Sequence, residues 1–202
     1  MAKIGLLGGT FDPIHNGHLH LGISSKNQLG LSKVVYIPAG NPPHKTSVRT
    51  NNEHRLNMIK LAISGEEGLC VSDYEINKKT RSYSVETIEH FKNEFPEDEF
   101  VFILGEDSLD YIESWYNAEK LLTICPFAVL KRGGYETGIL DKIKFLKEKY
   151  GADISLVDVS EMEISSSKIR EMLSMGEDIG DFVSDKVKDY IEKNNLYKDA
   201  EM

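Results

Sequence analysis

The chain has 202 residues, of which 40% are hydrophobic and 28% are charged, a composition that is ordinary for one soluble globular protein. Its 33 acidic and 24 basic residues give a net charge of −9, which argues against a nucleic-acid-binding protein or one that binds anionic membrane surfaces. A small anion can still be bound, because a few aimed donors outweigh the mean charge locally.

The sequence shows neither a signal peptide nor a membrane span. It runs from Met1 directly into a short apolar segment, and no apolar run approaches about 18 residues. We therefore expect a cytoplasmic protein. Cys70 and Cys125 lie in apolar segments without a metal-binding spacing, so we expect two buried free thiols.

Apolar runs bounded by turn residues predict six strands, at residues 3–7, 34–37, 69–72, 100–104, 127–130 and 154–159. Helical periodicity predicts helices at 19–29, 52–64, 85–95, 139–150 and 185–194, with shorter ones after residues 105 and 164. Ser84 is the expected N-cap of the third helix, and strand 100–104 is expected to be central. Strands that alternate with helices indicate an α/β fold with a doubly wound parallel sheet.

The segment Gly-Gly-Thr-Phe-Asp-Pro-Ile-His-Asn-Gly-His, residues 8–18, joins the first strand to the first helix. This turn is where an open parallel sheet binds a phosphate-bearing ligand. Gly8 and Gly9 have no Cβ, so the backbone there can approach a ligand closely. The spacing is neither the GxGxxG dinucleotide fingerprint nor a P-loop.

His15 and His18 are three residues apart and share one face of the first helical turn. Two donors at the positive end of a helix dipole suit a polyphosphate. A cap or core role for one histidine is the structural alternative. A zinc site is a poor alternative, because no third ligand is nearby in the sequence.

These residues resemble a known signature. His15-x-Gly17-His18 resembles the (H/T)xGH motif of the nucleotidylyltransferase superfamily, and Ile164-Ser-Ser-Ser-Lys-Ile-Arg170 resembles its late ISSTxIR motif, with Ser167 in place of threonine. Taken alone, the three serines are only a good N-cap. The resemblance implies a Rossmann-like fold of the nucleotidylyltransferase type, in a single domain over residues 1–202 with a small helical part from about residue 160.

Within the superfamily, the chain resembles the bacterial nicotinate-nucleotide adenylyltransferases along nearly its whole length. The matching segments are Gly8–Pro13, Asn41-Pro-Pro-His-Lys45, Arg81-x-Tyr-Ser-x-x-Thr87, Phe102-Ile-Leu-Gly-x-Asp-Ser108 and Trp115-Tyr116. The chain departs from that pattern at Glu106, where alanine is usual. The sole Trp would otherwise be assigned to the core, but it stands in a polar segment.

The resemblance implies a role for each matching residue. Its catalytic residues would be His15, His18, Lys45 and Arg170. ATP would be bound by Gly8, Gly9, Thr10, Phe11, Gly105, Asp107, Ile164, Ser165, Ser166 and Ser167. The acceptor would be bound by Thr87, Trp115, Tyr116 and Arg132. Mg²⁺ is expected mainly on the substrate phosphates, with no metal site on the protein.

The implied reaction is adenylyl transfer from ATP to nicotinate mononucleotide, which gives deamido-NAD and pyrophosphate in NAD biosynthesis. The acceptor phosphate is already an anion, so the protein has to position and neutralise charge and needs no nucleophile of its own. A related transferase that uses nicotinamide mononucleotide or phosphopantetheine is one alternative, and a non-catalytic nucleotide-binding module is another. The sequence does not fix the oligomeric state, and a homo-oligomer is among the options.

Overall fold

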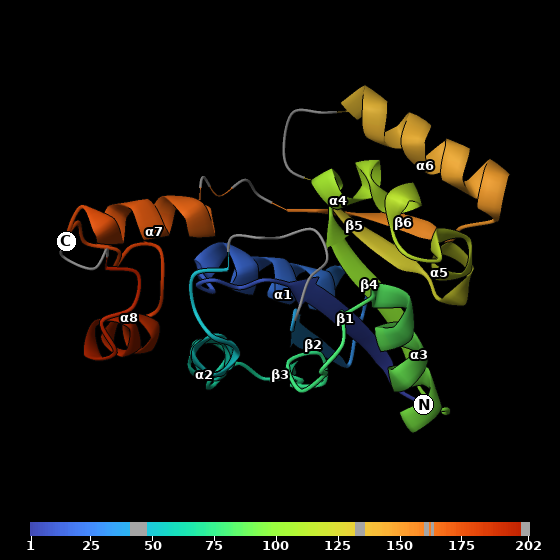
Figure 1. The fold of residues 1–202 in the computed structure, drawn as a ribbon. Helices are drawn as coiled ribbons and strands as arrows, with labels where there is room; N and C mark the ends of the chain where they lie inside the picture. Colours follow the sequence, from blue (N-terminus) through green and yellow to red (C-terminus); the bar gives the residue numbers. More distant parts are fainter. Residues whose placement is uncertain (41–47, 132–135, 160–161, 163, 199–202) are drawn as a thin grey trace.

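The computed structural model describes residues 1–40, 48–131, 136–159, 162 and 164–198. Its centre is a six-stranded sheet in the order β3-β2-β1-β4-β5-β6, in which every neighbouring pair is parallel (Figure 1). The strands are β1 (Lys3–Gly9), β2 (Lys33–Pro38), β3 (Leu69–Val71), β4 (Glu99–Gly105), β5 (Phe127–Lys131) and β6 (Ile154–Asp158). This order is that of the doubly wound, Rossmann-like sheet. From β1 the chain adds strands first on one side (β2, β3) and then, from β4 on, on the other side (β4, β5, β6).

The connecting segments are mostly helical. They contain α1 (Asn16–Gln28), α2 (Asn52–Ala62), α3 (Ser84–Glu94), α4 (Glu106–Asp110), the 3₁₀ turn η1 (Ile112–Ser114), α5 (Ala118–Ile124), α6 (Glu136–Tyr150), α7 (Ser166–Ser174) and α8 (Asp185–Lys193). The predicted α/β class, all six strands and the central place of β4 are confirmed.

Alternate residues of each central strand enter two hydrophobic clusters on opposite faces of the sheet. Leu7, Tyr36 and Ile103 pack on the face covered by α1, α2, α7 and α8. Leu6 and Phe102 pack on the face covered by α3, α5 and α6. Because both faces are covered, the strands read as continuous apolar runs, which is why the sequence located them well.

Two local predictions are wrong. Ser84 is the first residue of α3 and not its N-cap, because the carbonyl of Tyr83 already accepts the N–H groups of Glu86 and Thr87. Cys70 is exposed, whereas Cys125 is buried as expected. Cys70 is the middle residue of β3, which is three residues long and lies at the edge of the sheet, so its side chain points away from the face on which Leu69 is buried.

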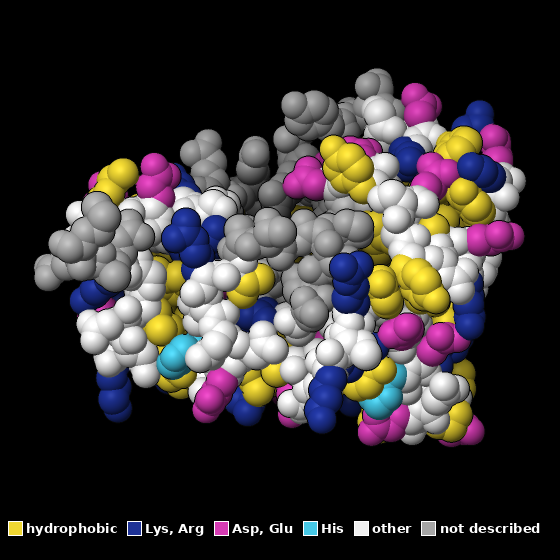
Figure 2. Space-filling model, in the orientation of Figure 1, with side chains coloured by type: hydrophobic (Ala, Val, Ile, Leu, Met, Phe, Trp, Pro, Cys, Tyr) yellow, Lys and Arg dark blue, Asp and Glu magenta, His cyan; other side chains and the backbone are white. Residues whose placement is uncertain are grey.

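The C-terminal helices share the main core. Ile169 of α7 and Val187 of α8 belong to the same cluster as Leu7 of β1. No helix among the described residues is both long and apolar enough to cross a bilayer. On the face of the molecule in Figure 2, Lys and Arg side chains are interspersed with Asp and Glu side chains.

Candidate active site

A cavity of about 730 Å³ opens at the carboxyl ends of β1 and β4. Gly8 and Thr10 line it from β1 and the turn after it, and Gly105 and Asp107 line it from the end of β4 and the start of α4. In an open parallel sheet this crevice, where the strand order reverses, is the place where ligands bind. Of the predicted ATP residues, Gly8, Gly9, Thr10, Gly105 and Asp107 therefore line this cavity, whereas Phe11 and residues 164–167 do not.

The turn after β1 is folded around the ring of Phe11. This residue is 2% exposed and has a φ of 49°, in the left-handed region. A Cβ on Gly9 would lie 2.7 Å from the Phe11 ring, so glycine is required there by the turn itself. The Phe11 ring also meets His18 edge-on, with 4.9 Å between ring centroids. Phe11 thus packs against the first turn of α1 and helps to fix its position.

His15 and His18 lie together at the start of α1, as predicted. His15 is the N-cap and is 6% exposed, and its ring stacks on His18 with 3.7 Å between centroids. The backbone N–H of His15 donates to Nδ1 of His18 at 3.3 Å. In a neutral imidazole this leaves the proton on Nε2, so Nε2 of His18 is a donor.

The helix α1 is held at this position by Tyr36 of β2. The Tyr36 hydroxyl, in a fully buried side chain, donates to the carbonyl oxygen of His18 at 3.0 Å. A Cβ on Gly22 would lie 2.0 Å from that hydroxyl oxygen, so the close approach of α1 to β2 needs glycine. Burial raises the pKa of Tyr36 far above its usual value, so the hydroxyl stays a donor.

The late motif packs directly on the early turn. The Ser166 hydroxyl donates to the carbonyl oxygen of Pro13 at 2.9 Å, and Nη1 of Arg170 donates to that of Asp12 at 2.6 Å. Ser165 is the N-cap of α7, and its side chain accepts the N–H of Lys168 at 3.2 Å. Ile164 lies beside Gly17, with 4.0 Å between its Cβ and an ideal Cβ at the glycine. The two predicted motifs are thus brought together, about 150 residues apart in the chain.

Asp12, in the turn after β1, also binds the segment before α2 and the segment after α8. Its carboxylate is 2% exposed and accepts the backbone N–H of Arg49 and the hydroxyl of Tyr197, both at 2.7 Å. Ser167 accepts a second N–H of Arg170 at 3.2 Å. A smaller polar cavity, of about 360 Å³, lies beside Arg170. It is lined by Arg49, Ser167, Arg170, Glu171, Ser174, Tyr197 and Lys198.

Arg55 of α2 is a site-supporting residue that the sequence analysis missed. It is 0% exposed, and its guanidinium donates to the carbonyl oxygens of Thr10 at 2.7 Å and Ala39 at 2.6 Å. It also donates to Oδ1 of Asn52 at 2.6 Å. Burial lowers the pKa of Arg55, while Asp12 raises it. Arg55 therefore ties the end of β2 to the turn after β1, and its helical position gave no sign of this role.

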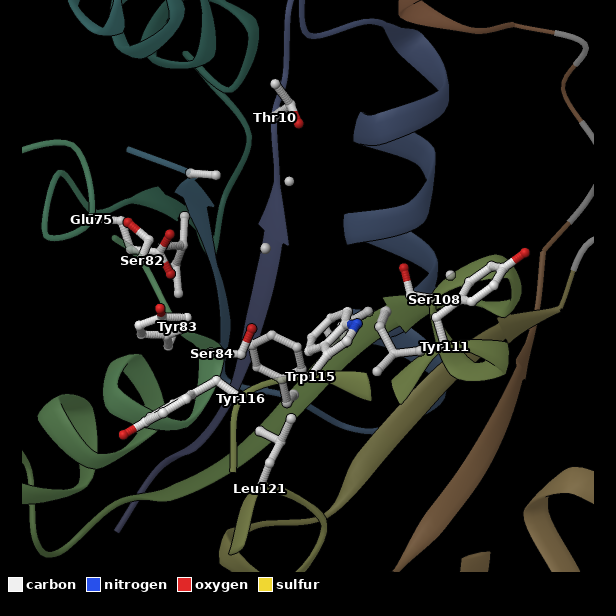
Figure 3. A pocket seen from close by; sticks show the side chains of 18 of the residues that line it. Thr10, Glu75, Ser82, Tyr83, Ser84, Ser108, Tyr111, Trp115, Tyr116 and Leu121 are labelled. Atoms are coloured by element: carbon white, nitrogen blue, oxygen red, sulfur yellow. The ribbon is translucent and has the colours of Figure 1, made fainter. Parts of the chain in front are cut away.

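Aromatic side chains form the other end of the large cavity. Trp115 and Tyr116 line it, as predicted for acceptor residues, together with Tyr83 and Tyr111. Figure 3 shows Trp115 between the side that carries Ser84 and the side that carries Tyr111. The rings of Tyr83 and Tyr116 lie 4.4 Å apart. This wall offers flat apolar faces on which a heteroaromatic ring can stack.

Thr87 lies behind this wall and does not line the cavity. It is 0% exposed, and its hydroxyl donates to Oε1 of Glu75 at 2.6 Å. Ser84 lines the cavity instead, at the N-terminus of α3, where N–H groups of the first turn have no partner inside the helix. The segment 81–87 thus borders the cavity at Ser84, three residues before Thr87.

Lys45 and Arg132 lie outside the described residues. Among the residues that are described, no cluster of three His, Cys, Asp or Glu side chains could hold a metal ion. The donors beside the turn are imidazole, hydroxyl and guanidinium groups, and the nearby Asp12 carboxylate is bonded within the protein. This set fits a divalent ion that is carried on substrate phosphates.

The chain matches a known family over most of its length. The cytidylyltransferase-like family matches residues 6–172. A probable nicotinate-nucleotide adenylyltransferase of Clostridium botulinum (strain Loch Maree / Type A3) is 41% identical over 201 residues, which cover 98% of this chain and 100% of the relative.

Solved structures agree with this match. A Plasmodium falciparum nicotinic acid mononucleotide adenylyltransferase complexed with APC superposes with a TM-score of 0.79 at 25% identity, over 98% of each chain. The same enzyme complexed with NaAD superposes with a TM-score of 0.79 at 26% identity, again over 98% of each chain. The chain therefore belongs to the cytidylyltransferase-like family and, within it, to the nicotinate-nucleotide adenylyltransferases.

Proposed function

We propose that this enzyme transfers the adenylyl group of ATP to nicotinate mononucleotide, giving nicotinate adenine dinucleotide and pyrophosphate. The observation that carries the proposal is the docking of the late motif on the early turn, through Arg170 and Asp12, beside an aromatic cavity. Thr10, in the early turn, lines the cavity that carries the stacking wall for a pyridine ring, and Arg170, which docks on that turn, lines the smaller polar cavity. The named relatives support this choice of substrates.

In the proposed reaction, a phosphate oxygen of nicotinate mononucleotide attacks the α-phosphorus of ATP. The bond from that phosphorus to the bridging oxygen of the β-phosphate breaks, and pyrophosphate leaves. Because the attacking phosphate is already an anion, no general base is required. The chain's task is to align the two phosphates and to stabilise the charge that develops between them.

Each motif has a place in this scheme. Nε2 of His18 donates to the ATP phosphates, next to His15. Arg170 and the serines at the mouth of α7 meet the same phosphates from the other side, with Lys45 assigned by the family resemblance. Thr10, Gly105 and Asp107 border the nucleoside. Mg²⁺ bound to the phosphates would neutralise part of their charge.

The acceptor lies against Trp115 and Tyr116 in this proposal. Its ring carboxylate is directed at the N-terminus of α3, where Ser84 lines the cavity. Backbone N–H groups and the helix dipole stabilise an anion there better than they stabilise a neutral amide. That difference favours nicotinate mononucleotide over nicotinamide mononucleotide. Cytoplasmic location, lack of nucleic-acid binding and the oligomeric state stay predictions.

The test is pyrophosphate release by the purified protein with ATP and Mg²⁺, measured with each acceptor in turn. We expect turnover with nicotinate mononucleotide at least about tenfold faster, in kcat/KM, than with nicotinamide mononucleotide, since one ionic contact is lost. Faster turnover with the amide or with phosphopantetheine would move the enzyme to that acceptor. No release with any acceptor, despite tight ATP binding, would favour a non-catalytic module.

A further inference from the structure

The carboxyl group of Glu75 lies in the wall of the aromatic cavity, and the proposed reaction gives it no role. Glu75 is 8% exposed and lines the cavity together with Ser82, Tyr83 and Ser84. Figure 3 shows its side chain on the same side as Ser82 and Tyr83, facing across the cavity from Trp115. Burying a carboxylate without hydrogen-bond partners would destabilise the fold, so the contacts of Glu75 indicate what holds it there.

Separate parts of the chain meet at Glu75. Thr87 of α3 donates its hydroxyl to Oε1 at 2.6 Å. The segment after β2 touches the backbone of the same residue, since a Cβ on Gly40 would lie 1.9 Å from the Glu75 carbonyl oxygen. Only glycine allows that approach. Glu75 thus joins α3 to the segment that leaves β2.

The contact with Thr87 reaches the first turn of α3. The backbone N–H of Thr87 donates to the carbonyl oxygen of Tyr83 at 3.1 Å. The ring of Tyr83 lies 4.4 Å from the ring of Tyr116. A line of contacts therefore runs from Glu75 through Thr87 to the N-terminus of α3 and to the aromatic wall.

We propose that Glu75 is a positioning residue for the acceptor. By accepting the Thr87 hydroxyl, it fixes the orientation of the first turn of α3 and of Tyr83, the surfaces that receive the pyridine ring and its carboxylate. Thr87 then supports acceptor binding through Glu75 and not by contact. This inference rests on the proposed function, because it assumes that the acceptor occupies the aromatic end of the cavity.

The ionised form of Glu75 accepts the Thr87 hydroxyl more strongly than the neutral form does. Burial raises the pKa of Glu75, and the Thr87 hydroxyl, which donates to its carboxylate, lowers it. The charged groups that face it are Lys78, on its own segment and bonded to Glu86, and Arg55, from α2. Acceptor affinity should therefore fall as the pH drops through the pKa of Glu75. Removing the Thr87 hydroxyl should move that fall to higher pH.

Trp115 makes a direct binding test available, since it is the only tryptophan of the sequence and it lines the cavity. Quenching of its fluorescence by nicotinate mononucleotide gives a Kd without turnover, and calorimetry gives the Kd of ATP. The variants are Thr87→Val, Thr87→Ser and Glu75→Gln. Thr123→Val, at an exposed position of α5, is the matched control.

We expect Thr87→Val to raise the Kd of nicotinate mononucleotide roughly tenfold, the factor that one buried hydrogen bond can supply. The Kd of ATP should change less than about twofold, and Thr87→Ser should restore most of the acceptor affinity because it keeps the hydroxyl. Against pH, the acceptor Kd should rise on the acid side at a higher pH in Thr87→Val than in the wild type. In Glu75→Gln this rise of the acceptor Kd at low pH should be absent. Only the pH dependence that comes from the acceptor's own phosphate, which all variants share, should remain.

Equal weakening of ATP and acceptor by Thr87→Val would overturn the inference, because it would show a general loss of structure. An unmoved pH profile in both Thr87→Val and Glu75→Gln would also overturn it. If Thr87→Val does not fold, the inference is tested by the other two variants. It then requires that Glu75→Gln lose the rise of the acceptor Kd at low pH and that Thr87→Ser keep most of the acceptor affinity. A wild-type protein that neither binds nor adenylates nicotinate mononucleotide would refute the proposed function, a result distinct from any difference among the variants.

Discussion

At the scale of single residues, His18 supports the turn, and in the proposed function it also contacts the ATP phosphates. Its Nδ1 accepts the N–H of His15, and its ring packs on His15 and Phe11. The remaining nitrogen, Nε2, is the donor assigned to the ATP phosphates. Because Nδ1 accepts a hydrogen bond within the turn and Nε2 is assigned to the substrate, a substitution can remove the substrate contact and keep the contact within the turn.

His18→Asn keeps an acceptor near the position of Nδ1 and removes Nε2. We expect its kcat to fall at least about 100-fold, the usual effect of losing one donor to transition-state charge. Its melting temperature should stay within a few degrees of the wild type. His20→Asn, on the same helix, is the control and should keep normal turnover. A wild-type kcat in His18→Asn would show that His18 is structural alone.

At the scale of elements, η1 is tied to α6 through Glu113, two residues before Trp115. The Glu113 carboxylate accepts from Lys142 and Lys149, each at 3.0 Å, and from the Tyr150 hydroxyl at 2.9 Å. These partners, Lys142 first, lower the pKa of Glu113 to about 2 from its usual 4.5. Helical periodicity in the sequence does not show which distant carboxylate the lysines of α6 meet.

The lowered pKa of Glu113 fixes the sign of a pH effect on stability. A carboxylate whose pKa is lower in the folded state stabilises the fold above its unfolded pKa, near 4.5, and loses this contribution as the pH falls toward about 2. Glu113→Gln should therefore lower the melting temperature at about pH 7, and the difference from the wild type should shrink through this window. The effect should be small and weaker in high salt, because the site is solvated.

Melting curves of the wild type, Glu113→Gln and the exposed control Glu119→Gln, recorded from about pH 7 down to about pH 2, check this prediction. The control should show no such convergence with the wild type. A difference for Glu113→Gln that is the same at every pH would mean that its contacts with α6 do not depend on charge.

The elements also show where prediction from sequence succeeds. The four inner strands were found because they are buried on both faces, and the two motifs were found because the spacing of their residues is local. Thr87 was expected to contact the acceptor but is buried and does not line the cavity, and Arg55 was missed. Their contacts with Glu75 and with the Thr10 carbonyl do not follow from the sequence pattern. Such contacts join residues 12 and 45 positions apart. A helical pattern states which residues share a face but not what that face meets.

At the scale of the whole molecule, burial separates the two cysteines. Cys125 is 8% exposed, and burial raises the pKa of its thiol to about 12, so it carries almost no thiolate at about pH 8. Cys70, on edge strand β3, is exposed. A thiol reagent should modify one cysteine quickly in the native protein and two after unfolding. The Cys70→Ser variant should lose the fast reaction, and two fast thiols in the native wild type would contradict the fold at β5.

The two ends of the chain meet at the site. Tyr197 and Arg170 bond to Asp12, and the core residues of α7 and α8 pack in the cluster of β1 and β2. We infer that residues 1–202 form a single domain with a small C-terminal helical part from about residue 160. In this arrangement the proposed phosphate site depends on the contact between the turn after β1 and the start of α7, which lie about 150 residues apart in the sequence.

The most direct test of adenylyl transfer follows the phosphorus atoms of ATP. The purified protein is incubated with Mg²⁺, nicotinate mononucleotide and ATP labelled at either the α- or the γ-phosphate, and the products are separated. We predict that the α-label enters nicotinate adenine dinucleotide and that the γ-label leaves in pyrophosphate. A γ-label on the acceptor, or an α-label that stays in ATP, would contradict this account.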